Sequence, residues 1–154
     1  MVQPTIAPFT GDLEELLPFF HMSTGIDGAD GVRQLIAMER TRGTRYYTAS
    51  LDGRVVGMIG FWFDPSGEVS ALEPPQVIDI AVLPDARRQG LARALMDTAV
   101  EAVRAAGYRH LWLYTDGNSA PLLAFYRRLR FRIISAVPDW FGEGTVKAIL
   151  RREL

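Results

Sequence analysis

The sequence predicts a mixed α/β (α+β) protein with a central sheet of about seven strands and about four helices, in the order βααβββαβαββ. Two observations predict this class. The strand-like runs at 76–83 and 110–115 flank an amphipathic helical pattern at 89–106, which makes a βαβ crossover whose strands are parallel neighbours or nearly so. Two β-rich runs meet at Asp52-Gly53, a strong signal for an antiparallel hairpin. Parallel and antiparallel strands together indicate a mixed sheet.

The first part of the chain predicts one strand and two short helices. Residues 4–10 have strand composition, and residues 13–22 repeat apolar side chains at helical spacing. Pro18 is expected to kink or shorten that helix, because proline lacks the amide N–H. After a glycine-rich joint, residues 32–40 place apolar side chains at three- and four-residue steps, which predicts the second helix.

The remaining elements follow from similar patterns. The hairpin strands are expected at 45–51 and 54–63, and a polar loop at 64–75 follows them. The run at 76–83 is almost continuously apolar and ends at Pro84, which is typical of a central strand covered on both faces. The elements that complete the order are the helix at 89–106 with one wet face (Arg93, Asp97, Glu101, Arg104), the strand at 110–115, a helix at 119–130 with Pro121 in its first turn, and closing strands at 131–137 and 145–154.

Length and composition exclude several classes of function. The chain has 154 residues, enough for one domain with its own core, so a single domain over 1–154 is expected. A net charge of -1 creates no overall positive field that would hold nucleic acid. The chain has no cysteine to supply thiolate ligands and only His21 and His110 to supply imidazole ligands, so no metal is expected. No signal-peptide pattern and no apolar run of ~18 to 20 residues occur, so we expect a cytoplasmic protein and no membrane.

The stretch ARRQGLARAL, residues 86–95, combines arginines and a glycine at the start of the predicted helix. A helix start offers unpaired N–H groups and a partial positive charge to an anion, and Arg87 and Arg88 add full charges. Gly90 has no Cβ to keep an oxygen from the main chain, and Ala92 is small. The residues alone leave two interpretations: a diphosphate cradle, or the charged start of a surface helix.

Two motifs resemble the signatures of the GNAT acetyltransferase superfamily. Arg87-Arg88-Gln89-Gly90-Leu91-Ala92 resembles its Q/R-x-x-G-x-G/A loop and follows IDIAVLP, the usual strand and proline. The run NSAPLLAFYRRLRF, residues 118–131, resembles its second signature, in which an Asn precedes a helix that carries a Tyr near its end, and a Phe follows. The predicted element order is similar to the GNAT fold over essentially the whole chain.

The resemblance implies an acetyl-CoA-dependent N-acetyltransferase. In that family acetyl-CoA lies where the strand at 76–83 splays from the strand at 110–115, and the acceptor is a primary amine of a small molecule, amino acid or peptide. The alternative is a non-catalytic acyl-CoA-binding or sensing module of the same fold. The cofactor-binding residues that the resemblance implies are Ile80, Ala81 and Val82 through main-chain groups, Arg87, Arg88, Gln89, Gly90, Leu91 and Ala92 at the pyrophosphate, and Asn118, which either contacts the cofactor or caps the helix.

The reaction needs a base and an acid. An alkylamine has a pKa near 10.4, so at pH 7 a proton acceptor must make it nucleophilic. Asp79 is the nearest carboxylate along the strand and shares a face with Val77 and Ala81; it serves either as the base, through a water, or as a buried acid that braces a loop. Glu73 is a weaker substitute. Tyr126 matches the family tyrosine that protonates the CoA thiolate, and its alternative is a packed helix tyrosine.

The sequence leaves the acceptor open. Arg130 stands where the family helix usually closes with Gly. Tyr114 stands where relatives that acetylate protein N-termini often have Glu, which weakens the interpretation of this protein as a ribosomal-protein N-acetyltransferase. Candidate acceptor residues each have a structural alternative. They are Asp27 and Asp30 (or turn residues), Trp62, Phe63, Trp140 and Phe141 (or core or dimer contacts), and His21 (or a structural histidine). A homodimer also remains open.

Overall fold

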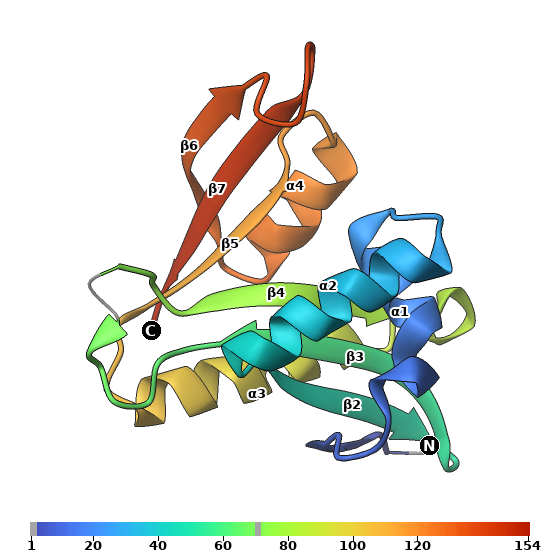
Figure 1. Ribbon diagram of the computed structural model, residues 1–154. Coiled ribbons are helices and arrows are strands. Elements are labelled where there is room, and N and C mark those ends of the chain that lie inside the picture. The colour runs from blue at the N-terminus through green and yellow to red at the C-terminus, as the bar shows by residue number, and fades with distance from the viewer. Residues whose placement is uncertain (1–2, 70–71) are drawn as a thin grey trace. The chain divides into compact units, whose positions relative to one another are not determined.

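A computed structural model describes residues 3–69 and 72–154 (Figure 1). The predicted order of strands and helices is confirmed, and the predicted loop at 64–75 includes two residues that lie outside the described ranges. The elements are β1 (Thr5–Pro8), α1 (Leu17–Thr24), α2 (Ala29–Arg42), β2 (Arg45–Leu51), β3 (Arg54–Trp62), β4 (Gln76–Val82), α3 (Leu91–Ala105), β5 (His110–Asp116), α4 (Ala120–Arg128), β6 (Arg132–Pro138) and β7 (Val146–Glu153).

The strands form a mixed sheet of seven in the order β1-β2-β3-β4-β5-β7-β6. The β4–β5 pair is parallel, with Gln76 opposite Trp112, whereas β1–β2, β2–β3, β5–β7 and β6–β7 are antiparallel. This confirms the predicted mixed sheet, and the splay of β4 from β5 stays a prediction. In residues 3–69 and 72–154 no helix combines the length and the apolar character that crossing a membrane requires.

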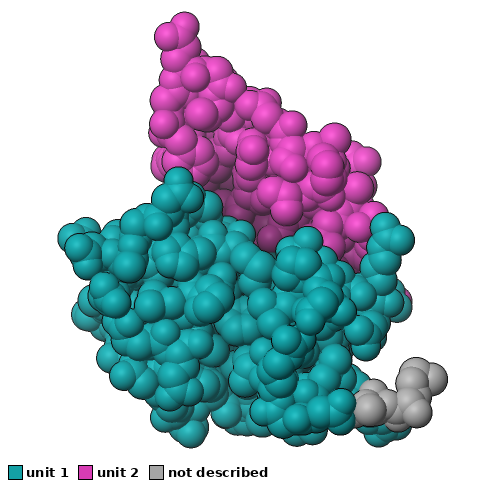
Figure 2. All heavy atoms as spheres, turned by 90° about the vertical axis from the view of Figure 1, so that its right-hand side faces the viewer, with its two compact units in different colours: residues 1–62, 77–99 teal, residues 63–76, 100–154 magenta. Residues whose placement is uncertain are grey.

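The chain divides into two compact units (Figure 2). Unit 1 contains residues 1–62 and 77–99, and unit 2 contains residues 63–76 and 100–154. One of the three boundaries follows the end of β3, and the other two fall inside β4 and inside α3, which are each one continuous element. A single domain over 1–154 stays a prediction.

In unit 1, β4 is covered on both faces, as its apolar run predicts. One face packs against α1 and α2. The core on this side consists of Leu13, Leu16, Phe19, Phe20, Val32, Ile36, Tyr46, Met58 and Ala81. On the other face a Cβ added to Gly57 would lie 3.1 Å from Leu95 of α3 and 3.3 Å from Val82. Glycine at position 57 thus lets α3 approach the sheet closely.

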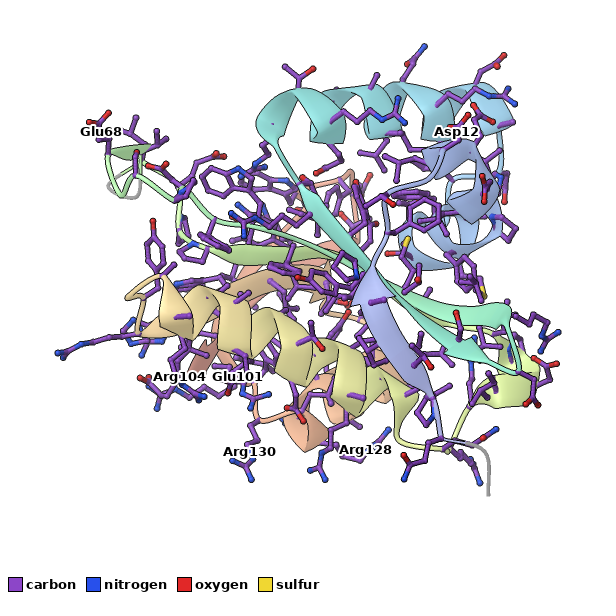
Figure 3. All side chains as sticks on the ribbon, turned by 90° about the horizontal axis from the view of Figure 1, so that it is seen from below. Asp12, Glu68, Glu101, Arg104, Arg128 and Arg130 are labelled. Atoms are coloured by element: carbon purple, nitrogen blue, oxygen red, sulfur yellow. The ribbon has the colours of Figure 1, made fainter. Side chains whose placement is uncertain are left out.

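Local signals explain where the helices begin and end. A 3₁₀ helix at Leu13–Leu16 precedes α1, and Pro18 lies in the first turn of α1, where no N–H is needed. Pro18 therefore shortens the predicted helix rather than kinking it. The wet face predicted for α3 is exposed, and Figure 3 shows Glu101 and Arg104 of this face pointing away from the helix, with an ion pair of 2.5 Å between them.

In unit 2, α4 covers one face of the β5-β7-β6 ladder. Leu111 and Leu113 of β5 and Leu150 of β7 are buried on that face, and Arg152 donates to the carbonyl oxygen of Leu129, at the end of α4, over 3.2 Å. Strand alternation then places Trp112, Tyr114, Lys147 and Arg151 on the opposite face.

Candidate acetyl-CoA and acetyl-transfer site

The loop between β4 and α3, where the sequence predicts an anion site, contains two residues in the left-handed region. Its residues 87–90 are exposed, and Arg88 and Gly90 have φ values of 63° and 78° in the left-handed region. The Nε of Arg87 donates to the carbonyl oxygen of Val82 over 3.0 Å, which anchors this side chain to β4. A Cβ at Gly90 would meet no atom within 4 Å, so backbone conformation rather than crowding favours glycine here.

The start of α3 fits a pyrophosphate. The first hydrogen bond of the helix runs from the N–H of Ala94 to the carbonyl oxygen of Gly90, over 3.0 Å. The N–H groups of Leu91, Ala92 and Arg93 come before it, so the helix itself offers them no carbonyl acceptor. The helix dipole places partial positive charge at these groups, and Arg87 and Arg88 contribute full charges beside them. The residues present therefore suit the diphosphate of acetyl-CoA, within unit 1 alone.

Asp79 is a buried carboxylate with one partner. It is 2% exposed and lies on the face of β4 that packs toward α1, as strand alternation predicts. The Oγ of Ser23 in α1 donates to its Oδ1 over 2.9 Å, whereas its Oδ2 has no hydrogen-bond partner among the described residues. Burial raises the pKa of Asp79 to about 6, the Ser23 hydrogen bond opposes this rise, and the charge of Glu39 adds to it.

Tyr46 lies beside Asp79, a contact that the sequence reasoning missed. Tyr46 of β2 pairs with Gly60 of β3. A Cβ at Gly60 would lie 2.7 Å from the Tyr46 ring and 3.6 Å from the Asp79 Oδ2, so the ring lies across Gly60 toward the carboxylate. The Tyr46 hydroxyl is buried without a described partner, and burial followed by the Asp79 charge raises the pKa of Tyr46. The sequence signal that could have predicted this contact is Gly60 itself, because a glycine inside a strand often marks a place where another group approaches the backbone closely.

Unit 2 holds the residues of the second signature. Tyr126 is half-buried and packs edge-to-face with Phe125 and Phe131, at ring-centroid distances of 5.0 and 6.1 Å. The helix cap is Ser119, whose side chain accepts from the N–H of Leu122, so of the two alternatives for Asn118 capping is wrong and contact with the cofactor stays a prediction. Asn118 instead donates to the carbonyl oxygen of Gly144 over 2.9 Å.

Several acceptor candidates have structural roles. Trp62 and Phe63 are buried, and the indole N–H of Trp62 donates to the Arg42 carbonyl oxygen over 2.8 Å, which favours their core alternative. The Nδ1 of His21 lies 2.6 Å from the Ile26 carbonyl oxygen. Two candidates, Trp140 and Phe141, are exposed.

Asp30 lies in the first turn of α2 and pairs with Arg33 at 3.2 Å. Asp30 is therefore a helical residue, so its alternative as a turn residue is wrong, and its acceptor role stays a prediction. Asp27 is exposed in the joint before α2.

Similar proteins agree with the motifs. A family model described as "Acetyltransferase (GNAT) family" matches residues 12–131. Streptothricin acetyltransferase of Streptomyces lavendulae is 31% identical over 116 residues, which is 75% of this chain and 57% of that protein. The ribosomal protein bS18-alanine N-acetyltransferase of Escherichia coli K12 is 32% identical over 80 residues, 47% of this chain and 54% of that protein. The chain thus spans about half the length of these curated relatives.

Solved structures share the fold. A GNAT-family protein from Desulfovibrio desulfuricans superposes with a TM-score of 0.79 at 25% identity and covers 98% of this chain and 99% of its own. A GNAT-family acetyltransferase from Elizabethkingia anophelis, solved with acetyl-CoA bound, gives a TM-score of 0.76 at 20% identity and covers 98% of each chain. By the match over residues 12–131, the chain belongs to the acetyltransferase (GNAT) family.

Proposed function

We propose that the protein is an acetyl-CoA-dependent N-acetyltransferase that transfers the acetyl group to a primary amine by direct attack on the thioester. The observation that carries the proposal is the loop from Arg87 to Gly90 with the exposed start of α3, because both arginines and the first N–H groups of the helix suit a diphosphate. Family membership supports acetyl-CoA as the ligand of this loop. The proposed acceptor is a primary amine of a small molecule, an amino acid or a peptide.

Main-chain groups of β4 complete the proposed cofactor site. In this proposal Ile80, Ala81 and Val82 bind the pantetheine arm through backbone hydrogen bonds, as an added strand would. A backbone N–H of this segment polarises the thioester carbonyl, which stabilises the oxyanion that forms when the amine attacks. Asn118 is proposed to contact the cofactor, as the family pattern implies; its side-chain amide also donates to the Gly144 carbonyl oxygen.

Asp79 is proposed as the base. A pKa of about 6 leaves the carboxylate mostly ionised at pH 7, while burial makes it a better proton acceptor than an ordinary aspartate. Its Oδ2, which has no described partner, is the atom that accepts the proton from the ammonium through a water. Ser23 holds the other carboxylate oxygen and thereby fixes the orientation of the side chain.

Tyr126 is proposed as the acid. A phenol with a pKa near 10 is protonated at pH 7 and can donate to the departing CoA thiolate. The packing of its ring against Phe125 and Phe131 fixes the ring at the end of α4. The nitrogen loses its second proton to solvent as the intermediate collapses, and the Tyr126 phenolate takes a proton back from solvent. The products are then the free thiol of CoA and the neutral amide, and Asp79 returns its proton to solvent, so that one proton is released overall.

The test measures free-thiol release from acetyl-CoA with a panel of small amines, amino acids and short peptides. We expect turnover with at least one acceptor, and a fall in kcat of about 100-fold for Tyr126→Phe, which removes the hydroxyl and keeps the ring. Tyr108→Phe is the matched control, because its hydroxyl binds the Asp64 carbonyl and has no proposed part in the reaction.

The panel and a thermal-shift measurement together separate the alternatives. Stabilisation by acetyl-CoA without thiol release from any acceptor would indicate a non-catalytic acyl-CoA-binding module. Absence of stabilisation at millimolar acetyl-CoA would refute the cofactor site. Turnover that is equal in wild type and Tyr126→Phe would refute the acid assignment alone.

A further inference from the structure

Lys147 lies between two aromatic rings in unit 2. Its Nζ is 3.9 Å from the centroid of the Tyr114 ring in β5 and 3.9 Å from the centroid of the Trp140 ring in the β6–β7 loop. A ring face attracts an ammonium through its quadrupole, and two faces restrict the side chain more than one. The ammonium is therefore held in place by aromatic contacts.

The charge of Lys147 is not neutralised by a carboxylate in the described part of the chain. Asp116 is opposite Lys147 in the β5–β7 ladder, but no ion pair joins them. Two arginines on this sheet face, Arg151 and Arg132 opposite it in β6, differ because they pair with Glu153 at 3.0 and 3.1 Å. His110 also lies 3.0 Å from Glu153. Lys147 is thus the cation of this face that keeps its charge for an incoming anion.

The loop that carries Trp140 is held by its own hydrogen bonds. The N–H of Gly144 donates to the Asp139 carboxylate over 2.8 Å, and the N–H of Asp139 donates to the Thr145 carbonyl oxygen over 2.7 Å. The side chain of Asn118 ties Gly144 to the segment after β5. This braced loop nevertheless leaves Trp140 57% and Phe141 67% exposed. Large aromatics exposed on a held loop favour contact with a ligand.

We propose that Lys147 binds the carboxylate of an amino-acid-like ligand whose apolar side chain contacts Trp140 and Phe141. A carboxylate accepts charge-assisted hydrogen bonds from the fixed ammonium, whose N–H groups have no protein acceptor among the described residues. A cationic group would have to displace Lys147 from the rings and would be repelled by it. The site therefore discriminates in favour of a free carboxylate.

In the proposed enzyme this ligand is the acceptor, an α-amino acid with an apolar side chain. That identification rests on the proposed function, whereas carboxylate binding by Lys147 does not. The two claims are separable because binding is measured with a ligand that is already acylated and cannot react.

The binding test follows the indole N–H resonances of Trp140 and Trp112 in two-dimensional NMR during titration of the full chain. The probes are N-acetylphenylalanine and N-acetylphenylalaninamide, which differ only in the carboxylate. We expect the acid to bind about 10-fold more tightly than the amide to wild type, and Lys147→Met to lose this preference. Arg128→Met is the matched control: it removes one exposed positive charge from α4 and is expected to keep the preference.

Equal binding of acid and amide by wild type, or an undiminished preference in Lys147→Met, would overturn the carboxylate site; the first result needs no variant to fold. Lys147→Arg keeps a cation for the rings and is expected to retain the preference. A Lys147-dependent preference without acetyl transfer to any amine would support the site and refute the proposed function. Acetyl transfer to phenylalaninamide as fast as to phenylalanine would overturn the assignment of the acceptor carboxylate.

Discussion

At the residue scale, the ionised carboxylate of Asp79 lowers the stability of the folded protein, because it is buried. Burial penalises the ionised carboxylate, and the single hydrogen bond from Ser23 offsets only part of this penalty. The nearby Tyr46 hydroxyl makes no hydrogen bond to it. A buried carboxylate of raised pKa is typical of functional sites, so this cost supports the proposed role of Asp79 as the base.

This cost predicts that Asp79→Asn stabilises the protein in a pH-dependent way. The folded pKa, about 6, lies above the unfolded value of 3.8, so the contribution of Asp79 to stability is present below the unfolded pKa and is lost as pH rises through the folded pKa. Asparagine has no charge to bury. We expect its free energy of unfolding to exceed that of wild type by about 2 kcal/mol at pH 7.5, with the difference nearly gone at pH 4.

Urea unfolding at both pH values measures this difference. Asp27→Asn removes an exposed carboxylate and is expected to change stability by less than about 0.5 kcal/mol. A loss of stability at pH 7.5 in Asp79→Asn would instead favour the bracing alternative, in which the ionised form of Asp79 is the stabilising one.

The sequence predicted part of this site for a physical reason. Strand alternation alone places Asp79 on the same face as Ala81, and the structure packs Ala81 in the core with α1 and α2. Ser23 and Tyr46 belong to elements that meet Asp79 only through tertiary packing, so no local pattern connects the three. The sequence did name Trp140 as a candidate acceptor residue, but it did not predict the contact of Trp140 with Lys147, because this contact depends on the path of the loop between them.

At the element scale, the end of α4 resolves what an arginine does in place of the usual glycine. Arg130 adopts a φ of 68°, and the N–H of Phe131 donates to the Tyr126 carbonyl oxygen over 3.0 Å, which closes the helix as a glycine would. Figure 3 shows the Arg130 side chain pointing away from the helix. The departure from the family pattern therefore leaves the turn intact and adds backbone strain. The sequence located this position, but the conformation depends on the hydrogen bonds that close the helix.

Arg130→Gly is accordingly expected to stabilise the protein by about 1 kcal/mol, because glycine adopts positive φ without a Cβ clash. Arg130→Ala is the matched control, since it removes the same side-chain charge and keeps the Cβ. Thermal unfolding of the three proteins measures the effect as a rise in Tm for glycine relative to alanine. Equal Tm values for glycine and alanine would show that the left-handed turn is not strained.

At the scale of the whole molecule, the two compact units share two continuous elements. The boundary at residues 99 and 100 falls inside α3, and the boundary at 76 and 77 falls inside β4. An isolated helix of this length is marginal in water, so α3 depends on packing along its whole buried side. Its buried residues come from both units: Leu95 and Met96 from unit 1, and Val100 and Val103 from unit 2.

Loss of either unit should therefore destabilise the other, and we predict one cooperative unfolding transition for residues 1–154. The tryptophans report on the units separately, because Trp62 belongs to unit 1 and Trp112 and Trp140 belong to unit 2. In Trp62→Phe the remaining fluorescence reports unit 2, and in the Trp112→Phe, Trp140→Phe double variant it reports unit 1. For each variant we expect the fluorescence midpoint in guanidinium chloride to coincide with that of far-UV circular dichroism of the same sample. Separate midpoints would mean that the units unfold independently and that the chain behaves as two domains.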